Sequence, residues 1–169
     1  MIATDRLLLI PATDATVAAS LEGSDKLAHA LEATVPATWP PDLLDRAALE
    51  WTLNWLRTPG NDPLWSMHWV VLQQPRTLVG IAGYKGAPLD GTVEVGYGVV
   101  TEYQRRGIAT EATQALVRNA LCTPEVIRVI AETLPGLAPS IGVLEKCGFT
   151  FLGEGSEEGV IRFEKRQAP

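Results

Sequence analysis

Residues 104–110 of the chain read QRRGIAT, and no other stretch constrains the architecture as strongly. It follows the apolar run VEVGYGVV at residues 93–100 and opens into an amphipathic pattern that starts near Ile108. A strand is therefore expected to lead through a short basic turn directly into a helix. The first turn of a helix leaves backbone N–H groups unpaired and carries the positive end of the helix dipole. With Arg105 and Arg106 beside it, this turn predicts a binding place for a phosphate or diphosphate.

The composition predicts one globular domain that spans residues 1–169. Hydrophobic residues make up 46% of the chain and charged residues 20%, which is typical of folded proteins. A length of 169 residues suits a single hydrophobic core. The formal net charge of −6 disfavours nucleic acid as a partner and suits a cationic substrate such as an amine. The arginines of the 104–110 turn therefore indicate a local anion site on an acidic chain.

Cysteine and histidine usage predicts a metal-free protein of the reducing cytoplasm. Cys122 and Cys147 are too few for a disulfide framework and show no C-x-x-C spacing, so we interpret them as free thiols. His29 and His68 do not combine with them in a zinc-binding spacing. Residues 1–10 do not resemble a signal peptide, and no apolar run approaches the roughly 20 residues that span a bilayer. We therefore expect a cytoplasmic protein with neither a metal nor a membrane partner.

Hydrophobic periodicity and turn residues predict a chain that mixes helices and strands. Helical patterns cover residues 14–33 with a break at Gly23-Ser24, a segment capped by Asp42 or Asp45 that stops at Pro59, and residues 108–121 and 139–146. Strand patterns cover residues 6–10, 65–73, 77–84, 93–100, 127–133, 149–152 and 160–163. The order of these elements indicates an α+β fold with a mixed sheet.

Four segments of the chain share motifs with one protein superfamily. They read TDRLLL at residues 4–9, EVGY at 94–97, QRRGIA at 104–109 and SIGVLEKCGF at 140–149. In this order they resemble the opening strand, the E-x-G-Y strand, the Q/R-x-x-G-x-G/A loop and the S-x-x-V-L-E-K-x-G-F helix of GNAT acyltransferases. Within that superfamily the pattern is similar to the branch of ribosomal-protein N-terminal acetyltransferases (RimJ/RimL-like), and it covers nearly the whole chain.

The resemblance implies a GNAT acyl-CoA N-acyltransferase fold of the α+β class. In that fold a mixed, mostly antiparallel sheet is splayed between the fourth and fifth strands and is flanked by helices. The resemblance also implies acetyl-CoA as co-substrate and an amine as acceptor. Gly107 would let the backbone approach the diphosphate of the cofactor. The residues of this loop that the resemblance assigns to the cofactor are Gln104, Arg105, Arg106, Gly107, Ile108, Ala109 and Thr110.

The resemblance further assigns groups around the thioester. The backbone of Val99 and Val100 is expected at the splay, where an N–H group would contact the thioester carbonyl and the pantetheine would pair like an extra strand. Ser140 is expected to bind the cofactor sulfur and protonate the departing thiolate, with local capping as the alternative. Two positions depart from the pattern. Leu137 replaces an Asn that commonly holds the cofactor, and Leu144 replaces a Tyr that is the general acid in many members.

Glu94 is the candidate general base. It shares one face of its strand with Gly96 and Gly98, so its carboxylate borders open space. There it can accept a proton from a substrate ammonium, directly or through water. A solvent-facing residue or a salt-bridge partner is the alternative interpretation.

Aromatic residues are candidates for the acceptor site. Tyr97 is a candidate wall of the acceptor channel, with packing as the alternative. Trp39, in the Pro-rich loop 36–41, is a second candidate wall. Trp51 and Trp55 lie four residues apart in one helical pattern and are expected to pack in the core.

The predicted activity is transfer of the acetyl group of acetyl-CoA to an amine by direct attack in a ternary complex, without a covalent enzyme intermediate. The acceptor is expected to be a protein N-terminal amine. Two alternatives stay open: a small amine such as an antibiotic or polyamine, and a non-catalytic acyl-CoA-binding module, which Leu137 and Leu144 favour. Dimers are common among relatives, so a homodimer is one expected assembly.

Overall fold

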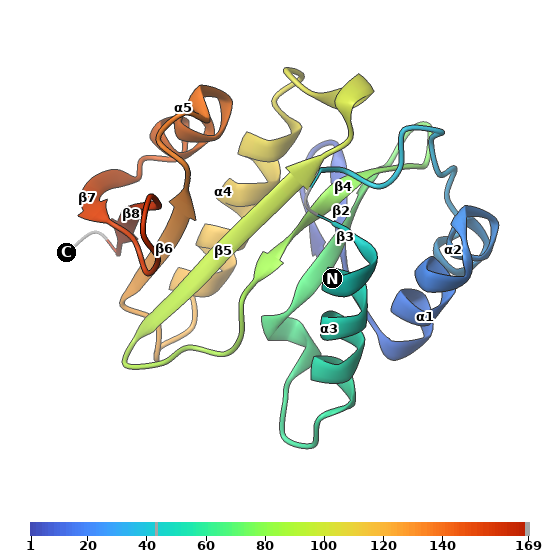
Figure 1. Cartoon of the computed structure of the whole chain (residues 1–169), viewed down its shortest axis with the longest axis horizontal. Helices are drawn as coiled ribbons and strands as arrows, with labels where there is room; N and C mark the ends of the chain where they lie inside the picture. Colours follow the sequence, from blue (N-terminus) through green and yellow to red (C-terminus); the bar gives the residue numbers. More distant parts are fainter. Residues whose placement is uncertain (43, 168–169) are drawn as a thin grey trace.

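The described residues form one mixed sheet of eight strands with helices packed against both faces (Figure 1). The computed structural model describes residues 1–42 and 44–167. The strand order is β1-β2-β3-β4-β5-β6-β8-β7. Within the described ranges, β5 and β6 run parallel and the other neighbouring pairs run antiparallel. The strands are β1 (Ile2–Ala3), β2 (Leu7–Pro11), β3 (Met67–Leu72), β4 (Thr77–Tyr84), β5 (Thr92–Val99), β6 (Arg128–Thr133), β7 (Thr150–Glu154) and β8 (Ile161–Arg166).

The helices divide between the two faces of the sheet. They are α1 (Asp14–Glu22), α2 (Ser24–Leu31), α3 (Arg46–Arg57), α4 (Ile108–Leu121) and α5 (Ala138–Lys146), with short 3-10 turns η1 (Pro63–Trp65) and η2 (Thr101–Tyr103). In Figure 1, α1, α2 and α3 gather toward one end of the sheet, whereas α4 runs behind β5. The predicted α+β architecture is confirmed, and so is the break between α1 and α2.

Local signals set the helix ends. Gly23 separates α1 from α2 with a φ of 137°. Asp45 caps α3, because its Oδ1 accepts a hydrogen bond from the Ala48 amide at 2.8 Å, so Asp45 and not Asp42 is the cap. Gly148 follows α5 with a φ of 78°, the left-handed conformation that commonly ends a helix.

Two hydrophobic clusters, one on each face, hold the sheet between the helices. Because successive strand residues point to opposite faces, neighbouring residues of β3 enter different clusters. The first cluster unites Leu7, Leu9, Val70, Val93 and Val95 with Ile108, Leu116 and Leu144 of α4 and α5. The second unites Trp69, Val71 and Leu78 with Val17, Leu27 and Leu31 of α1 and α2. On β5, the valines therefore face α4, and the alternate residues face the side of α1–α3.

The predicted core position of Trp51 is wrong. Its exposed fraction is 61%. The buried residues of α3 are Leu49 and Thr52, and Leu53 and Leu56 pack partly against the same cluster. These four positions follow the i, i+3, i+4, i+7 spacing of one helix face, and Trp51 lies off that face.

Both cysteines are free thiols, Cys122 exposed and Cys147 buried. Burial raises the pKa of Cys147 to about 11, with the nearby charge of Lys165 acting in the opposite direction. No helix in the described part of the chain is both long and apolar enough to cross a membrane. The same residues contain no group of three or more His, Cys, Asp or Glu side chains placed to hold a metal ion.

Candidate active site

The turn between β5 and α4 presents unpaired backbone N–H groups. Gly107 precedes the helix with φ 77° and ψ 4°, and Arg105 also has a positive φ of 58°. The first helical hydrogen bond runs from the Glu111 amide to the Gly107 carbonyl oxygen at 3.0 Å. No side chain among residues 1–42 and 44–167 caps this end of α4. The amides of residues 108–110 are therefore available to an anion, aided by the helix dipole.

Contacts among residues 99–106 help to hold this loop in shape. The Gln104 side-chain amide donates to the carbonyl oxygen of Val99 at 3.0 Å, which ties the loop to the end of β5. The Arg106 guanidinium lies 5.0 Å from the ring centroid of Tyr103. Residues 104–107 are all exposed to solvent. The predicted cofactor loop is thus an ordered, accessible turn.

Strands β5 and β6 part from each other beside this loop. The two strands pair in parallel at three positions: Thr92 lies opposite Arg128, Val93 opposite Val129, and Glu94 opposite Ile130. Beyond the last pair the two strands continue without pairing with each other, β5 staying paired with β4 and β6 with β8, and Figure 1 shows them diverging toward their C-terminal ends. The predicted splay is confirmed. The strands that part are the fifth and sixth instead of the fourth and fifth, because residues 2 and 3 form the additional strand β1.

The register of β5 decides which backbone groups face this gap. The Val100 amide donates to the Val79 carbonyl oxygen at 3.0 Å, so it is used by the sheet, which corrects the expectation that this N–H serves the cofactor. Val99 occupies the alternate position of the antiparallel ladder, where N–H and C=O point away from β4. The same alternation turns the main chain of Tyr97 toward β6. The backbone groups at the splay are therefore those of Val99 and Tyr97.

The Tyr97 side chain contacts the start of α5. Its hydroxyl donates to the Ser140 carbonyl oxygen at 3.0 Å and lies 3.2 Å from the Ser140 Oγ. Burial raises the pKa of Tyr97 to about 12, although the hydrogen bond with Ser140 opposes this rise, so the phenol stays protonated at neutral pH. Tyr97 packs with the α4 and α5 cluster. The structure thus places this side chain on the side of α5, away from the face of β5 that carries Glu94.

Glu94 lies at the point where β5 and β6 part, on the opposite face of β5 from the Tyr97 side chain. Its carboxylate forms an ion pair with Lys85, and its side chain is 21% exposed. A Cβ on Gly96 would lie 3.9 Å from Lys85, and one on Gly98 would lie 3.5 Å from Pro41. The two glycines therefore leave room, as predicted, and Lys85 and the Pro-rich loop border that room. The alternative interpretation of Glu94, a salt-bridge partner, is present in the structure.

The Pro-rich loop lies against the end of β5. The Thr38 hydroxyl donates to Glu102 of η2 at 3.1 Å, which anchors the loop near the cofactor turn. The Trp39 ring packs with its centroid 5.9 Å from that of Trp69, and the side chain is partly buried. Packing therefore accounts for Trp39, and its role toward an acceptor stays a prediction.

An open groove of about 740 Å³ continues from the turn along the outer side of α4. Residues that line it include Gly107, Thr110, Gln114, Arg118 and Lys146. The groove starts at the unpaired amides and is lined by the cationic Arg118 and Lys146 and by the acidic Asp5 and Glu111. An extended anionic ligand that starts at the amides can reach the two cationic side chains along this groove.

Known proteins share this fold. The model of the GNAT acetyltransferase domain matches residues 6–150. A putative GNAT-family acetyltransferase from Bordetella pertussis is similar at 23% identity, with 97% of this chain and 98% of that chain covered and a TM-score of 0.67. A putative ribosomal-protein-serine acetyltransferase from Vibrio cholerae shows 20% identity, coverage of 98% and 97%, and a TM-score of 0.67. RimL, a ribosomal L7/L12 alpha-N-protein acetyltransferase in complex with coenzyme A, shows 19% identity, coverage of 96% and 95%, and a TM-score of 0.67. No curated protein sequence matches the chain significantly.

A match over most of the chain, together with the splayed sheet and the uncapped helix, identifies the class. The chain belongs to the GNAT acetyltransferase family. It is an acetyl-CoA-dependent N-acetyltransferase that transfers an acetyl group to an amine.

Three contacts of this site have no signal in the local sequence. They are the Tyr97–Ser140 hydrogen bonds, the Lys85–Glu94 ion pair, and a contact between Arg6 and the 104–110 loop. The partners in the first and third are 43 and 100 residues apart. Arg6 belongs to the TDRLLL motif, which the sequence predicts as a strand. Nothing in that motif indicates that Arg6 contacts the Arg106 carbonyl oxygen.

Proposed function

We propose that this acetyltransferase acts on the N-terminal amine of a protein in the cytoplasm. Binding of acetyl-CoA is supported by the uncapped start of α4, which lies beside the splay of β5 and β6. The structural likeness to two ribosomal-protein acetyltransferases supports the acceptor class. The two free thiols support a reducing compartment.

In this proposal the diphosphate of acetyl-CoA binds the amides of residues 107–110. Arg105 and Arg106 add charge-assisted hydrogen bonds from the exposed side of the loop. The pantetheine continues along β5, where the main chain of Val99 and Tyr97 faces the gap. The adenosine end occupies the groove along α4, near Arg118 and Lys146.

The chemistry then needs a base on one side of β5 and an acid on the other. Glu94 takes a proton from the substrate ammonium, directly or through water, and the neutral amine attacks the thioester carbonyl. An amide of β5 stabilises the oxyanion of the tetrahedral intermediate. When the C–S bond breaks, the Ser140 hydroxyl donates its proton to the thiolate and regains one from the nitrogen of the intermediate, directly or through water, which leaves the neutral amide and the free thiol. Tyr97 holds Ser140 in place.

The test of this function is release of coenzyme A with a panel of acceptors. We expect turnover with peptides that carry a free N-terminal amine, and one acetyl group on that amine by mass spectrometry. The control is the same peptide with a blocked N-terminus, which should not react. Turnover with antibiotics or polyamines alone would contradict the proposed acceptor. Binding of acetyl-CoA without turnover on any acceptor would instead identify a binding module.

Removing the Ser140 hydroxyl should slow the chemical step. We expect Ser140→Ala to lower kcat about tenfold and Tyr97→Phe about threefold, since general acid catalysis contributes at least this much and a thiolate is a good leaving group. The KM for acetyl-CoA should change less than kcat. Steady-state kinetics with acetyl-CoA and a peptide acceptor measure both values.

Tyr84→Phe is the matched control for that pair. Tyr84 is also a buried strand tyrosine, and burial raises its pKa to about 12 while a hydrogen bond from Asn119 opposes the rise. Its hydroxyl donates to the Leu116 carbonyl oxygen at 2.8 Å, away from Ser140. Tyr84→Phe should lower stability by about 1 kcal/mol and leave kcat unchanged. Equal losses of kcat in Tyr97→Phe and Tyr84→Phe would contradict the role of Tyr97.

A further inference from the structure

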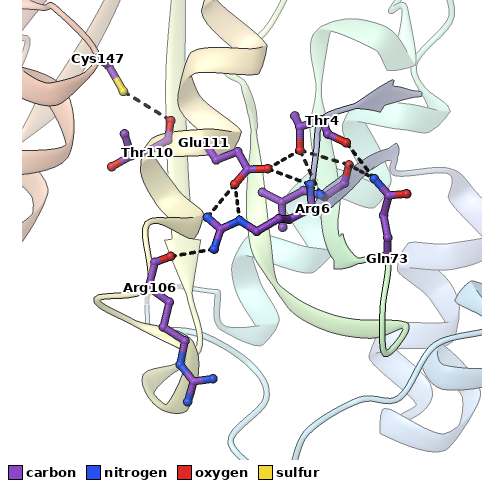
Figure 2. Close-up of polar contacts among 8 residues, drawn as sticks. Thr4, Arg6, Gln73, Arg106, Thr110, Glu111 and Cys147 are labelled. Carbon is purple, nitrogen blue, oxygen red and sulfur yellow. Dashed lines mark hydrogen bonds and ion pairs between the residues drawn. The ribbon is translucent and has the colours of Figure 1, made fainter.

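The Glu111 carboxylate in the first turn of α4 is bound by the start of the chain, more than 100 residues away in sequence (Figure 2). Its Oε2 accepts from Arg6 Nε at 2.7 Å and lies 2.6 Å from Arg6 Nη2. Its Oε1 accepts from the Thr4 hydroxyl at 2.6 Å and from the Arg6 amide at 3.1 Å. The opening strand motif is therefore attached to the helix that begins the cofactor site.

The same guanidinium reaches the cofactor turn itself. Arg6 Nη1 donates to the Arg106 carbonyl oxygen at 3.1 Å, as Figure 2 shows. A Cβ on Gly107 would lie 3.4 Å from Arg6 Nη2, so the guanidinium packs directly against this peptide. In a planar trans peptide the C=O and N–H groups point in opposite directions. By holding the Arg106 carbonyl, Arg6 therefore turns the Gly107 N–H to the other side of the loop, where it is open to a ligand.

Glu111 also poses an electrostatic difficulty for an anion site. Burial opposes its ionisation, yet hydrogen bonds from Thr4 and Arg6 outweigh that effect and lower its pKa, so Glu111 is an anion at neutral pH. A carboxylate in the first helical turn repels a diphosphate bound at the same helix end. The Arg6 guanidinium compensates that charge at contact distance. The pair is partly exposed, with 49% of the Arg6 side chain and 20% of the Glu111 side chain accessible.

We propose that Arg6 is a positioning residue for the diphosphate of acetyl-CoA. It orients the peptide between Arg106 and Gly107 and compensates the charge of Glu111, and it does not contact the reacting atoms. This inference rests on the proposed placement of the diphosphate at residues 107–110. Arg6 then governs cofactor affinity from the bend between β1 and β2, while catalysis takes place at the splay.

The experiment compares Arg6→Ala and Arg6→Lys with Arg57→Ala. Arg57 forms a similar bidentate pair with Asp14, at 2.7 and 3.0 Å, between α3 and α1 and away from the cofactor turn. We expect Arg6→Ala to raise the KM for acetyl-CoA and the calorimetric Kd for coenzyme A about tenfold. The kcat at saturating acetyl-CoA and the KM for the amine should stay within about twofold of the wild type. Arg6→Lys should lose part of the affinity, and Arg57→Ala none.

A second variant separates charge compensation from a general loss of structure. If Glu111 repels the diphosphate once Arg6 is gone, adding Glu111→Gln to Arg6→Ala should tighten coenzyme A binding at least threefold. A double variant that binds as weakly as Arg6→Ala, or more weakly, would overturn the electrostatic part of the proposal. Unchanged affinity in Arg6→Ala, or equal losses in Arg57→Ala, would overturn all of it. Wild-type protein that binds no coenzyme A would instead refute the proposed cofactor site, and this inference with it.

Discussion

Replacing Gly107 by valine should weaken acetyl-CoA binding about 100-fold. Gly107 has a φ of 77°, a conformation that a β-branched residue avoids, so the variant must move the turn. Moving it displaces the amides at the start of α4. Each hydrogen bond to a charged group contributes about 1.5–3 kcal/mol, so losing one or two of them amounts to about 3 kcal/mol. That free energy corresponds to roughly two orders of magnitude in Kd.

The backbone conformation makes this prediction testable with a matched control. Gly60, in the turn after α3, has a φ of 92°, and a Cβ there would meet no atom within 4 Å. Gly60→Val should therefore cause similar backbone strain without touching the cofactor site. Thermal unfolding should show comparable losses of stability for the two variants. Calorimetry with coenzyme A should show weakened binding for Gly107→Val alone.

A milder substitution covers the case in which valine prevents folding. Gly107→Ala adds one methyl group and costs about 1–2 kcal/mol in a left-handed position. We expect its Kd for coenzyme A to rise about tenfold. A folded Gly107→Ala protein with wild-type affinity would refute the assignment of the diphosphate to this turn.

Features of this site that depend on adjacent residues were predictable from the sequence. α4 follows a 3.6-residue pattern over 14 residues, and the glycine before it marks its start, so both were readable from adjacent residues. The splay required the superfamily resemblance, because no local pattern states which neighbouring strands stop pairing. The register between β5 and β6 then places Glu94 opposite Ile130, in the last pair before the two strands part.

The features that sequence could not supply depend on tertiary register. Whether the amide of Val99 or of Val100 faces the gap changes with a shift of one residue in the pairing with β4, and strand composition does not specify that shift. The predicted core face of α3 is wrong because the large apolar side chain of Trp51 does not decide which face packs, whereas Leu49 and Leu53 lie on the face that contacts the second cluster. The contact between Tyr97 and Ser140 joins two motifs that lie 43 residues apart, and neither motif specifies the other as its partner.

Replacing Glu94 by glutamine should lower kcat about 100-fold near neutral pH, since a positioned general base contributes at least this much. Glutamine keeps the size of the side chain and removes its basicity. At higher pH more of the acceptor is already the neutral amine, so the deficit of the variant should shrink. Rates of coenzyme A release across a pH series, at saturating concentrations of both substrates, measure this change.

The ion pair with Lys85 supplies the control that separates a base from a structural carboxylate. The hypothesis of a catalytic base and that of a structural ion pair both predict that Glu94→Gln lowers activity, because the variant removes the carboxylate that pairs with Lys85. They differ for Lys85→Ala. A structural pair is broken equally from either side, so the two variants should then lose similar activity. If Glu94 is a base, it keeps its proton-accepting oxygen when Lys85 is removed. Lys85→Ala should then retain at least about a third of the wild-type kcat.

The position of Glu94 explains why its partner should be replaceable. The carboxylate sits where β5 and β6 part, and its Lys85 partner is 58% exposed and attached to the end of β4. A substrate ammonium that enters from the side of α1–α3 carries the same charge as Lys85 and can take its place beside the carboxylate. A base at this position needs no reorganisation to accept the proton, because the Lys85 ammonium occupies that place before the substrate arrives. Full activity of Glu94→Gln at every pH would exclude this role and leave the ion pair as its only function.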